Sequence, residues 1–168
     1  LYDHPEIAFE EHKACAWISE YLEEKGFQVE RSAGGVETAF YAKIPGQETS
    51  LKVALLAEYD ALPKIGHGCG HNLIAAASVG AGIALSHCLD GIEGSFVVVG
   101  TPAEEGGGGK ILLLEAGVFD DVSAAMMFHP SSRTGVGSDS LGRIKFTVEF
   151  FGKTAHASGS PEEGLNAL

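Results

Sequence analysis

The chain has 168 residues, of which 45% are hydrophobic and 20% are charged. These proportions are typical of one globular domain, or of one domain with part of a second, and they exclude a disordered or fibrous protein. The 23 acidic residues outnumber the 11 lysines and arginines, and the net charge of −12 argues against a nucleic acid or an anionic membrane surface as partner.

The first half of the chain opens with a helical pattern over residues 5–25. Apolar residues recur there every three or four positions, which predicts one buried helical face that includes Trp17. The continuous apolar run at 53–57 predicts a strand that is covered on both faces. Two shorter strands are expected at 27–30 and 39–44.

The second half continues this alternation of helices and strands. The apolar stretch 73–89 is interrupted by two serines and a histidine, so it predicts a buried helix rather than a membrane span. A shorter helix is expected at 110–116, and apolar runs at 96–99 and 124–128 predict two more covered strands. The order of elements therefore predicts an α/β fold, with a mostly parallel sheet flanked by helices.

The pattern changes after this region. Residues 144–151 alternate between apolar and polar side chains, which predicts a strand with one wet face that opens a different sheet.

Cysteines are few and widely spaced. Their odd number argues against a disulfide framework and favours a reducing compartment, so we expect a cytoplasmic protein. Cys15 and Cys88 fall in expected helical segments and are interpreted as small packing residues, which leaves Cys69 as the cysteine with a candidate role.

Polar side chains gather where each of the three covered strands ends. Parallel sheets place their sites at this edge, and imidazole, thiolate and carboxylate are the ligands of zinc and related ions. The residues concerned are Glu58, Asp60, His67, Cys69 and His71 after the first strand, Glu104 and Glu105 after the second, and His129 after the third.

The Cys69-Gly70-His71 segment is the sharpest metal signal. Residues two apart in an extended segment point the same way, so Cys69 and His71 can grip one ion. The alternative is a glycine loop with incidental polar residues. His67 is either a third ligand or a packing residue near the site.

The adjacent Glu104 and Glu105 offer a division of labour. One carboxylate can ligate the ion, while the other takes a proton from an activated water. The alternative is a solvated acidic turn, but a position between a buried strand and four glycines is a poor place for one.

Two other chemistries are disfavoured. The glycine run 106–109 lacks the spacing and the Ser/Thr of a phosphate loop. A Cys69 nucleophile paired with His71 or His129 is a second enzyme hypothesis, but nearby carboxylates raise a thiol pKa rather than lower it. His156, in a turn of small residues, is equally compatible with a surface and a functional role.

The ordered motifs resemble those of a known family. They are Glu58-Tyr59-Asp60-Ala61-Leu62-Pro63, Gly66-His67-Gly68-Cys69-Gly70-His71-Asn72, Thr101-Pro102-Ala103-Glu104-Glu105-Gly106, His129-Pro130 and Gly152-Lys153-Thr154-Ala155-His156-Ala157. The chain is similar to the metal-dependent amidohydrolases and exopeptidases of the aminoacylase and succinyl-diaminopimelate desuccinylase family. Its Cys-x-His pair is most similar to the p-aminobenzoyl-glutamate hydrolase and indole-acetyl-amino-acid hydrolase branch.

The resemblance implies a role for each matching residue. Cys69, His71, Glu105 and His129 match metal ligands for one or two Zn²⁺ or Mn²⁺ ions. Glu104 matches the general base, Asp60 the carboxylate that orients the site, and His156 a lid-domain histidine that reaches the partner's site in a homodimer. Residues 1–142 match an incomplete catalytic domain and 143–168 the start of the lid domain. We expect this segment to lack the family's last ligand, a histidine farther along the chain.

The expected function is therefore hydrolysis of an amide bond in a small N-acyl amino acid, aminobenzoyl-glutamate or dipeptide. Glu58 and Asn72 depart from the motifs of some relatives, so the acyl group stays open. The alternative is a non-catalytic metal-binding or dimerisation module.

Overall fold

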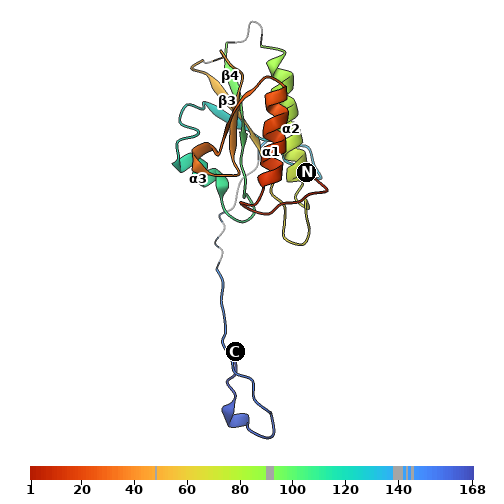
Figure 1. Ribbon diagram of the computed structural model, residues 1–168, viewed down its shortest axis with the longest axis vertical. Helices are drawn as coiled ribbons and strands as arrows, with labels where there is room; N and C mark the ends of the chain where they lie inside the picture. The colour runs from red at the N-terminus through yellow and green to blue at the C-terminus, as the bar shows by residue number, and fades with distance from the viewer. Residues whose placement is uncertain (48, 90–92, 138–141, 143, 145) are drawn as a thin grey trace. The chain divides into compact units, whose positions relative to one another are not determined.

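The computed structural model describes residues 1–47, 49–89, 93–137, 142, 144 and 146–168 (Figure 1). These residues form two compact units, Leu1–Ser132 and Arg133–Leu168. Within the described residues, none of the helices has the length and apolar character needed to cross a bilayer.

The first unit is built on a five-stranded sheet of order β1-β2-β4-β3-β5. β4 pairs in parallel with β3, which pairs in parallel with β5, whereas β2 is antiparallel to both β1 and β4. The α/β class is confirmed, and the sheet is mixed rather than mostly parallel. The strands are β1 (Gln28–Arg31), β2 (Phe40–Lys43), β3 (Lys52–Ala57), β4 (Ser95–Gly100) and β5 (Ala124–Met126).

Helices cover both faces of this sheet, as Figure 1 shows. α1 (His12–Glu24) and α2 (His71–Ser86) pack on one face, where Leu55 and Val98 point toward them. α3 (Gly109–Glu115) lies on the other face, where Leu113 packs against Val97 and Val99. Because side chains alternate along a strand, β3 and β4 feed two separate cores, as expected for strands covered on both faces.

The first helix begins later than predicted. The pattern over 5–25 predicts a helix from Pro5, but α1 starts at His12. The Glu6 carboxylate accepts the backbone N–H groups of Lys13 at 3.1 Å and Ala14 at 2.9 Å, so it caps the helix from outside. The Glu6 carbonyl also accepts the Ala61 N–H at 2.8 Å, which ties this segment to the loop after β3.

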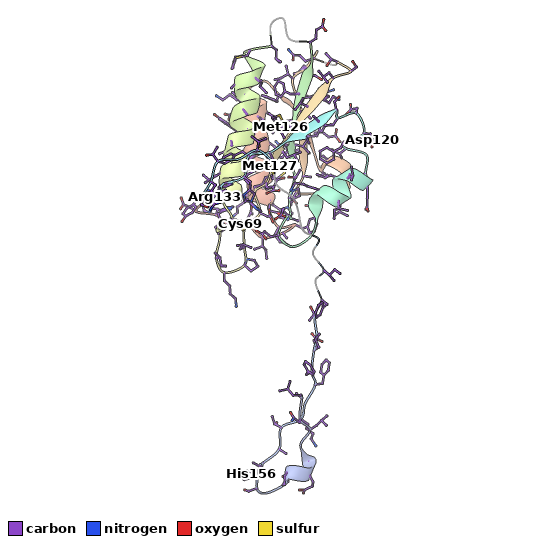
Figure 2. The ribbon with its side chains drawn as sticks, turned by 180° about the vertical axis from the view of Figure 1, so that it is seen from behind. Cys69, Asp120, Met126, Met127, Arg133 and His156 are labelled. Atoms are coloured by element: carbon purple, nitrogen blue, oxygen red, sulfur yellow. The ribbon has the colours of Figure 1, made fainter. Side chains whose placement is uncertain are left out.

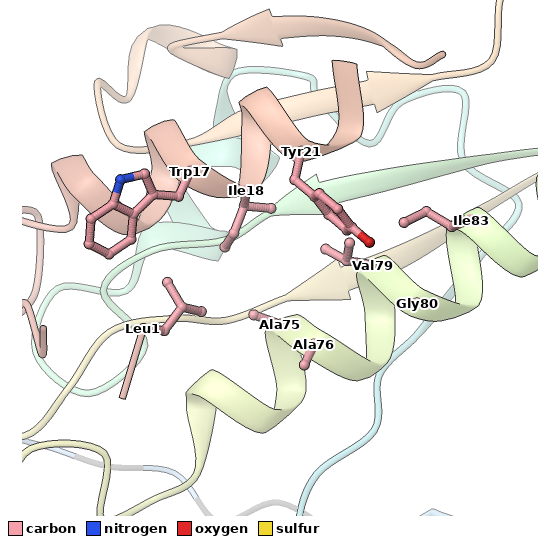
Figure 3. A pocket seen from close by; sticks show the side chains of 9 residues that line it. All are labelled: Leu1, Trp17, Ile18, Tyr21, Ala75, Ala76, Val79, Gly80 and Ile83. Carbon is pink, nitrogen blue, oxygen red and sulfur yellow. The ribbon is translucent and has the colours of Figure 1, made fainter. Parts of the chain in front are cut away.

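Two predicted packing residues are exposed. Trp17 keeps 41% of its surface open and stacks edge-on against the His4 ring, so its prediction as core is wrong. The ring borders an apolar pocket of about 500 Å³ between α1 and α2 (Figure 3). Cys15 is buried as predicted, but Cys88 lies beyond the end of α2 and is exposed.

The third apolar run forms an edge strand. β5 pairs with β3 on one side, and its three residues are all exposed. The prediction of a strand covered on both faces is therefore wrong for 124–128, because no described segment packs over Met126, Met127 and Phe128 well enough to bury them.

The second unit carries little regular structure. Its described part includes a 3-10 helix at Pro161–Glu163 and a bridge in which Lys153 and Leu165 exchange two backbone hydrogen bonds of 2.9 Å. The strand predicted at 144–151 is not formed by the described residues of that range. A strand needs a neighbour for its backbone groups, and no described segment pairs with these residues. Their apolar members are exposed: Ile144, Phe146, Val148, Phe150 and Phe151.

Candidate metal centre

The site lies where β3, β4 and β5 end. These parallel strands deliver their following loops to one edge of the sheet. Asp60 and His71 come from the loop after β3, Glu104 and Glu105 follow β4, and His129 follows β5.

Cys69, His71 and Glu105 form the tightest group of possible ligands. One ligand atom from each side chain lies within 4.8 Å of the other two. Gly70, between the first two, has φ +77°, and a Cβ there would lie 2.7 Å from Cγ of Pro130. The absence of a side chain at Gly70 lets the Cys69 loop pack closely against the His129-Pro130 segment.

The buried imidazole of His71 has one nitrogen held and the other turned toward carboxylates. Its Nδ1 lies 2.7 Å from Oδ1 of Asp60. Because an ionised carboxylate only accepts, Nδ1 carries the hydrogen and the Nε2 lone pair of a neutral ring is free for an ion. Around Nε2 lie carboxylate oxygens of Glu58 at 3.3 Å and of Glu104 and Glu105 at 3.9 Å.

The electrostatics of this cluster favour a positive charge. Burial lowers the pKa of His71, but the hydrogen bond and charge of Asp60, together with Glu58 and Glu104, raise it above its ordinary value. Burial raises the pKa of Asp60, yet the hydrogen bonds from His71 and from the Glu105 N–H bring it below its ordinary value. Carboxylates and imidazole lone pairs around one point fit a divalent cation.

His129 presents a similar nitrogen to the same region. Its ring centroid lies 6.2 Å from that of His71, with the rings edge to face. Nδ1 of His129 lies 2.9 Å from the Pro130 carbonyl oxygen, so it carries the hydrogen and leaves the lone pair on Nε2. Two neutral imidazoles with oriented nitrogens are suited to ligating metal.

The Cys69 thiol does not resemble an activated nucleophile. A hydrogen bond with Glu105 raises its pKa to about 11, with burial and the charges of Glu105, Glu104 and Asp60 acting in the same direction. A catalytic thiol needs a lowered pKa. The geometry therefore disfavours the Cys69 nucleophile hypothesis and fits a thiolate that forms when a cation binds.

Glu58 is a site residue to which the sequence assigned no role. It is fully buried, one oxygen pairs with Lys110, and the other has no hydrogen-bond partner and lies near His71. The available signal was its position directly after the buried strand, which it shares with Asp60.

Two other candidate histidines lie outside this group. His67 is half-buried, its Nδ1 has no hydrogen-bond partner, and burial lowers its pKa. His156 belongs to the second unit, where its Nδ1 accepts the backbone N–H of Gly159 at 3.0 Å. Figure 2 labels Cys69 and His156 on their respective units.

Comparison with known proteins gives consistent relatives. The family model described as peptidase family M20/M25/M40 matches residues 54–165. The chain is 40% identical over 185 residues to the Xaa-Arg dipeptidase of Mus musculus. It is 39% identical over 188 residues to one of the p-aminobenzoyl-glutamate hydrolase polypeptides of Escherichia coli strain K12. All of this chain is aligned in both cases, but it spans only 42% and 39% of the two relatives.

A solved structure agrees with these sequence matches. The crystal structure of a dinuclear metal-binding peptidase of the M20 family from Bacillus subtilis superposes with a TM-score of 0.67 and 31% identity, covering 74% of this chain and 38% of that chain. The family expected from the motifs is thus confirmed. The chain belongs to the peptidase family M20/M25/M40.

Proposed function

We propose that the protein hydrolyses an amide bond in a small N-acyl amino acid, aminobenzoyl-glutamate or dipeptide, with the help of a divalent metal. The observation that carries the proposal is the group of Cys69, His71 and Glu105, whose ligand atoms lie within 4.8 Å of one another at the edge of the sheet. The printed activities of the relatives, a dipeptidase and an aminobenzoyl-glutamate hydrolase, support the substrate class.

The metal would be held by Cys69, His71, Glu105 and His129. One or two Zn²⁺ or Mn²⁺ ions suit this mixture of sulfur, nitrogen and oxygen donors. A bound ion would polarise the substrate carbonyl and lower the pKa of a water molecule toward 7.

Glu104 is the proposed general base. Its side chain is 45% exposed, and one of its oxygens lies 3.9 Å from Nε2 of His71. Such a carboxylate lies beside the candidate ligands and is open to substrate and water. It can accept the proton of the attacking water and pass it to the leaving amine.

Asp60 is the proposed orienting carboxylate, and its two oxygens have two separate tasks. Oδ1 accepts from Nδ1 of His71, and Oδ2 accepts the Glu105 N–H at 2.9 Å. One buried side chain therefore fixes both the ring and the backbone of two candidate ligands.

Replacing Asp60 with asparagine should weaken metal binding by about 10–100-fold without unfolding the sheet. Asparagine offers one acceptor oxygen, so one of the two hydrogen bonds is replaced by two facing donors. Competitive metal titration of the full-length protein measures the change, with the exposed Asp120→Asn as the control. An Asp60→Asn variant with wild-type affinity would remove the orienting role.

His156 is the proposed carbonyl-binding residue, supplied to the site by the partner in a homodimer. Its Nδ1 accepts backbone N–H groups from Ser158 and Gly159, so a neutral ring carries its hydrogen on Nε2. An exposed Nε2–H is a suitable donor to a carbonyl oxygen that becomes negative during attack. We assign residues 1–142 to the catalytic domain and 143–168 to the start of the lid domain, and we keep a cytoplasmic location as part of the proposal.

A substrate panel on the full-length protein tests this function. N-acyl amino acids, aminobenzoyl-glutamate and dipeptides should include substrates that are cleaved in proportion to the metal content of the sample. A protein that binds metal and forms dimers but cleaves none of these classes would favour the non-catalytic module instead.

A further inference from the structure

The first unit contains a second buried carboxylate beside the site, on an element distant in sequence. Glu11 immediately precedes α1 and is fully buried, and burial raises its pKa above the ordinary value. One of its oxygens accepts the backbone N–H of Ala103 at 2.8 Å, across 92 positions of sequence. Burying a carboxylate is costly, so the contact with Ala103 calls for a structural reason.

Ala103 has an unusual backbone conformation. Its φ is +58°, in the left-handed region that residues with a Cβ seldom adopt. Its carbonyl oxygen accepts N–H groups from Gly107 at 3.0 Å and Gly108 at 2.8 Å. Both polar backbone groups of Ala103 are therefore anchored, and strained residues persist where surrounding contacts hold them in this way.

The next two residues are the proposed base and a proposed ligand. Glu11 holds the N–H just before Glu104, while Asp60 accepts the N–H of Glu105. The N-terminal segment also supports the turn through packing, since a Cβ on Gly107 would lie 2.1 Å from the Phe9 ring. The backbone that carries Glu104 is thus fixed from both sides.

We propose that Glu11 is a positioning residue that holds Ala103 in the left-handed conformation and thereby directs Glu104 toward its substrate. This inference rests on the proposed function, because it assumes that Glu104 performs chemistry. Glu11 acts through a hydrogen bond to the backbone, so what it must provide is an acceptor oxygen at this place, and its negative charge is dispensable.

The decisive comparison is between Glu11→Leu and Glu11→Gln in the full-length protein. Leucine fills the space without an acceptor, whereas glutamine keeps one oxygen for the Ala103 N–H. Glu11→Leu should lower kcat by about 10–100-fold with KM and metal content close to wild type, because a displaced catalytic group costs mainly turnover. Glu11→Gln should keep most of the wild-type kcat. The exposed neighbour supplies the matched control, Glu10→Leu.

Amide hydrogen exchange gives a readout that does not depend on turnover. Exchange in the peptide 101–109 should be faster in Glu11→Leu and close to wild type in Glu11→Gln. Should Glu11→Leu fail to fold, Glu11→Asp withdraws the carboxylate by one methylene and should show the same two changes to a smaller degree.

Two results would overturn the inference. The first is a folded Glu11→Leu or Glu11→Asp protein with wild-type kcat and exchange. The second is a Glu11→Gln protein that loses as much kcat as Glu11→Leu. Failure of the proposed function is distinguishable, because an inactive wild-type protein would still show whether removing the Glu11 oxygen loosens residues 101–109.

Discussion

Replacing Glu104 with glutamine in the full-length protein should lower kcat by at least about 100-fold, the usual loss when a general base is removed. Glutamine preserves the shape of the side chain but cannot take a proton from water. The metal content should stay at the wild-type level, because Glu105 rather than Glu104 belongs to the tight ligand group with Cys69 and His71. Steady-state kinetics and metal analysis on the same sample measure both quantities.

The two adjacent glutamates can be told apart by this experiment. Glu115→Gln, an exposed change at the end of α3, is the control and should leave kcat unchanged. A Glu104→Gln protein with normal kcat would transfer the role of base to another group. Loss of metal instead would mean that the roles of Glu104 and Glu105 are reversed.

Replacing His156 with alanine should lower kcat by about 100-fold or more while metal content and thermal stability stay unchanged. Its Nε2–H is proposed to stabilise charge on the carbonyl oxygen, and removing one such donor typically costs about 10²–10³-fold in kcat. The side chain is exposed in its own unit, so alanine removes no buried contact. His87→Ala, at an exposed position after α2, is the matched control.

A complementation experiment decides whether His156 acts across a dimer. A mixed dimer of His156→Ala and Glu104→Gln protomers has one site with both groups intact. With random exchange, half of the dimers are mixed and half of their sites are whole, so about one quarter of wild-type activity should return. If exchange of protomers is verified and the mixture stays inactive, His156 acts within its own chain or not at all.

The sequence was informative about the site because the chemistry is concentrated at strand ends. Apolar runs located β3 and β4, and the polar residues that follow them converge in the structure as the parallel arrangement requires. Local patterns were sufficient here because burial on both faces leaves an unambiguous mark on a strand.

Predictions that depended on distant partners were less successful. The run 124–128 has the composition of a covered strand, yet β5 lies at an edge and is exposed. The alternation at 144–151 suits a half-buried strand, but its described residues have no pairing neighbour. Helical spacing likewise placed Trp17 on the face of α1, but it could not show that the pocket beside the ring is open.

The buried carboxylates show a further limit of sequence reasoning. Glu11 and Glu58 read as ordinary acidic residues, and only the fold shows that both are buried and aimed at the site. Glu11 meets Ala103 over 92 positions, a distance over which no local pattern carries information. Such contacts are set by tertiary packing, which is why the supporting residues were missed while the proposed ligands were found.

The most direct test of the account is the metal content of Cys69→Ser compared with Cys88→Ser in the full-length protein. Cys69 lies in the ligand group, whereas Cys88 is exposed beyond α2. After dialysis against metal-free buffer, Cys88→Ser should retain the wild-type content of zinc or manganese and the wild-type activity. Cys69→Ser should lose most of both while its circular dichroism spectrum stays unchanged. Full metal occupancy and normal activity in Cys69→Ser would contradict the proposed centre.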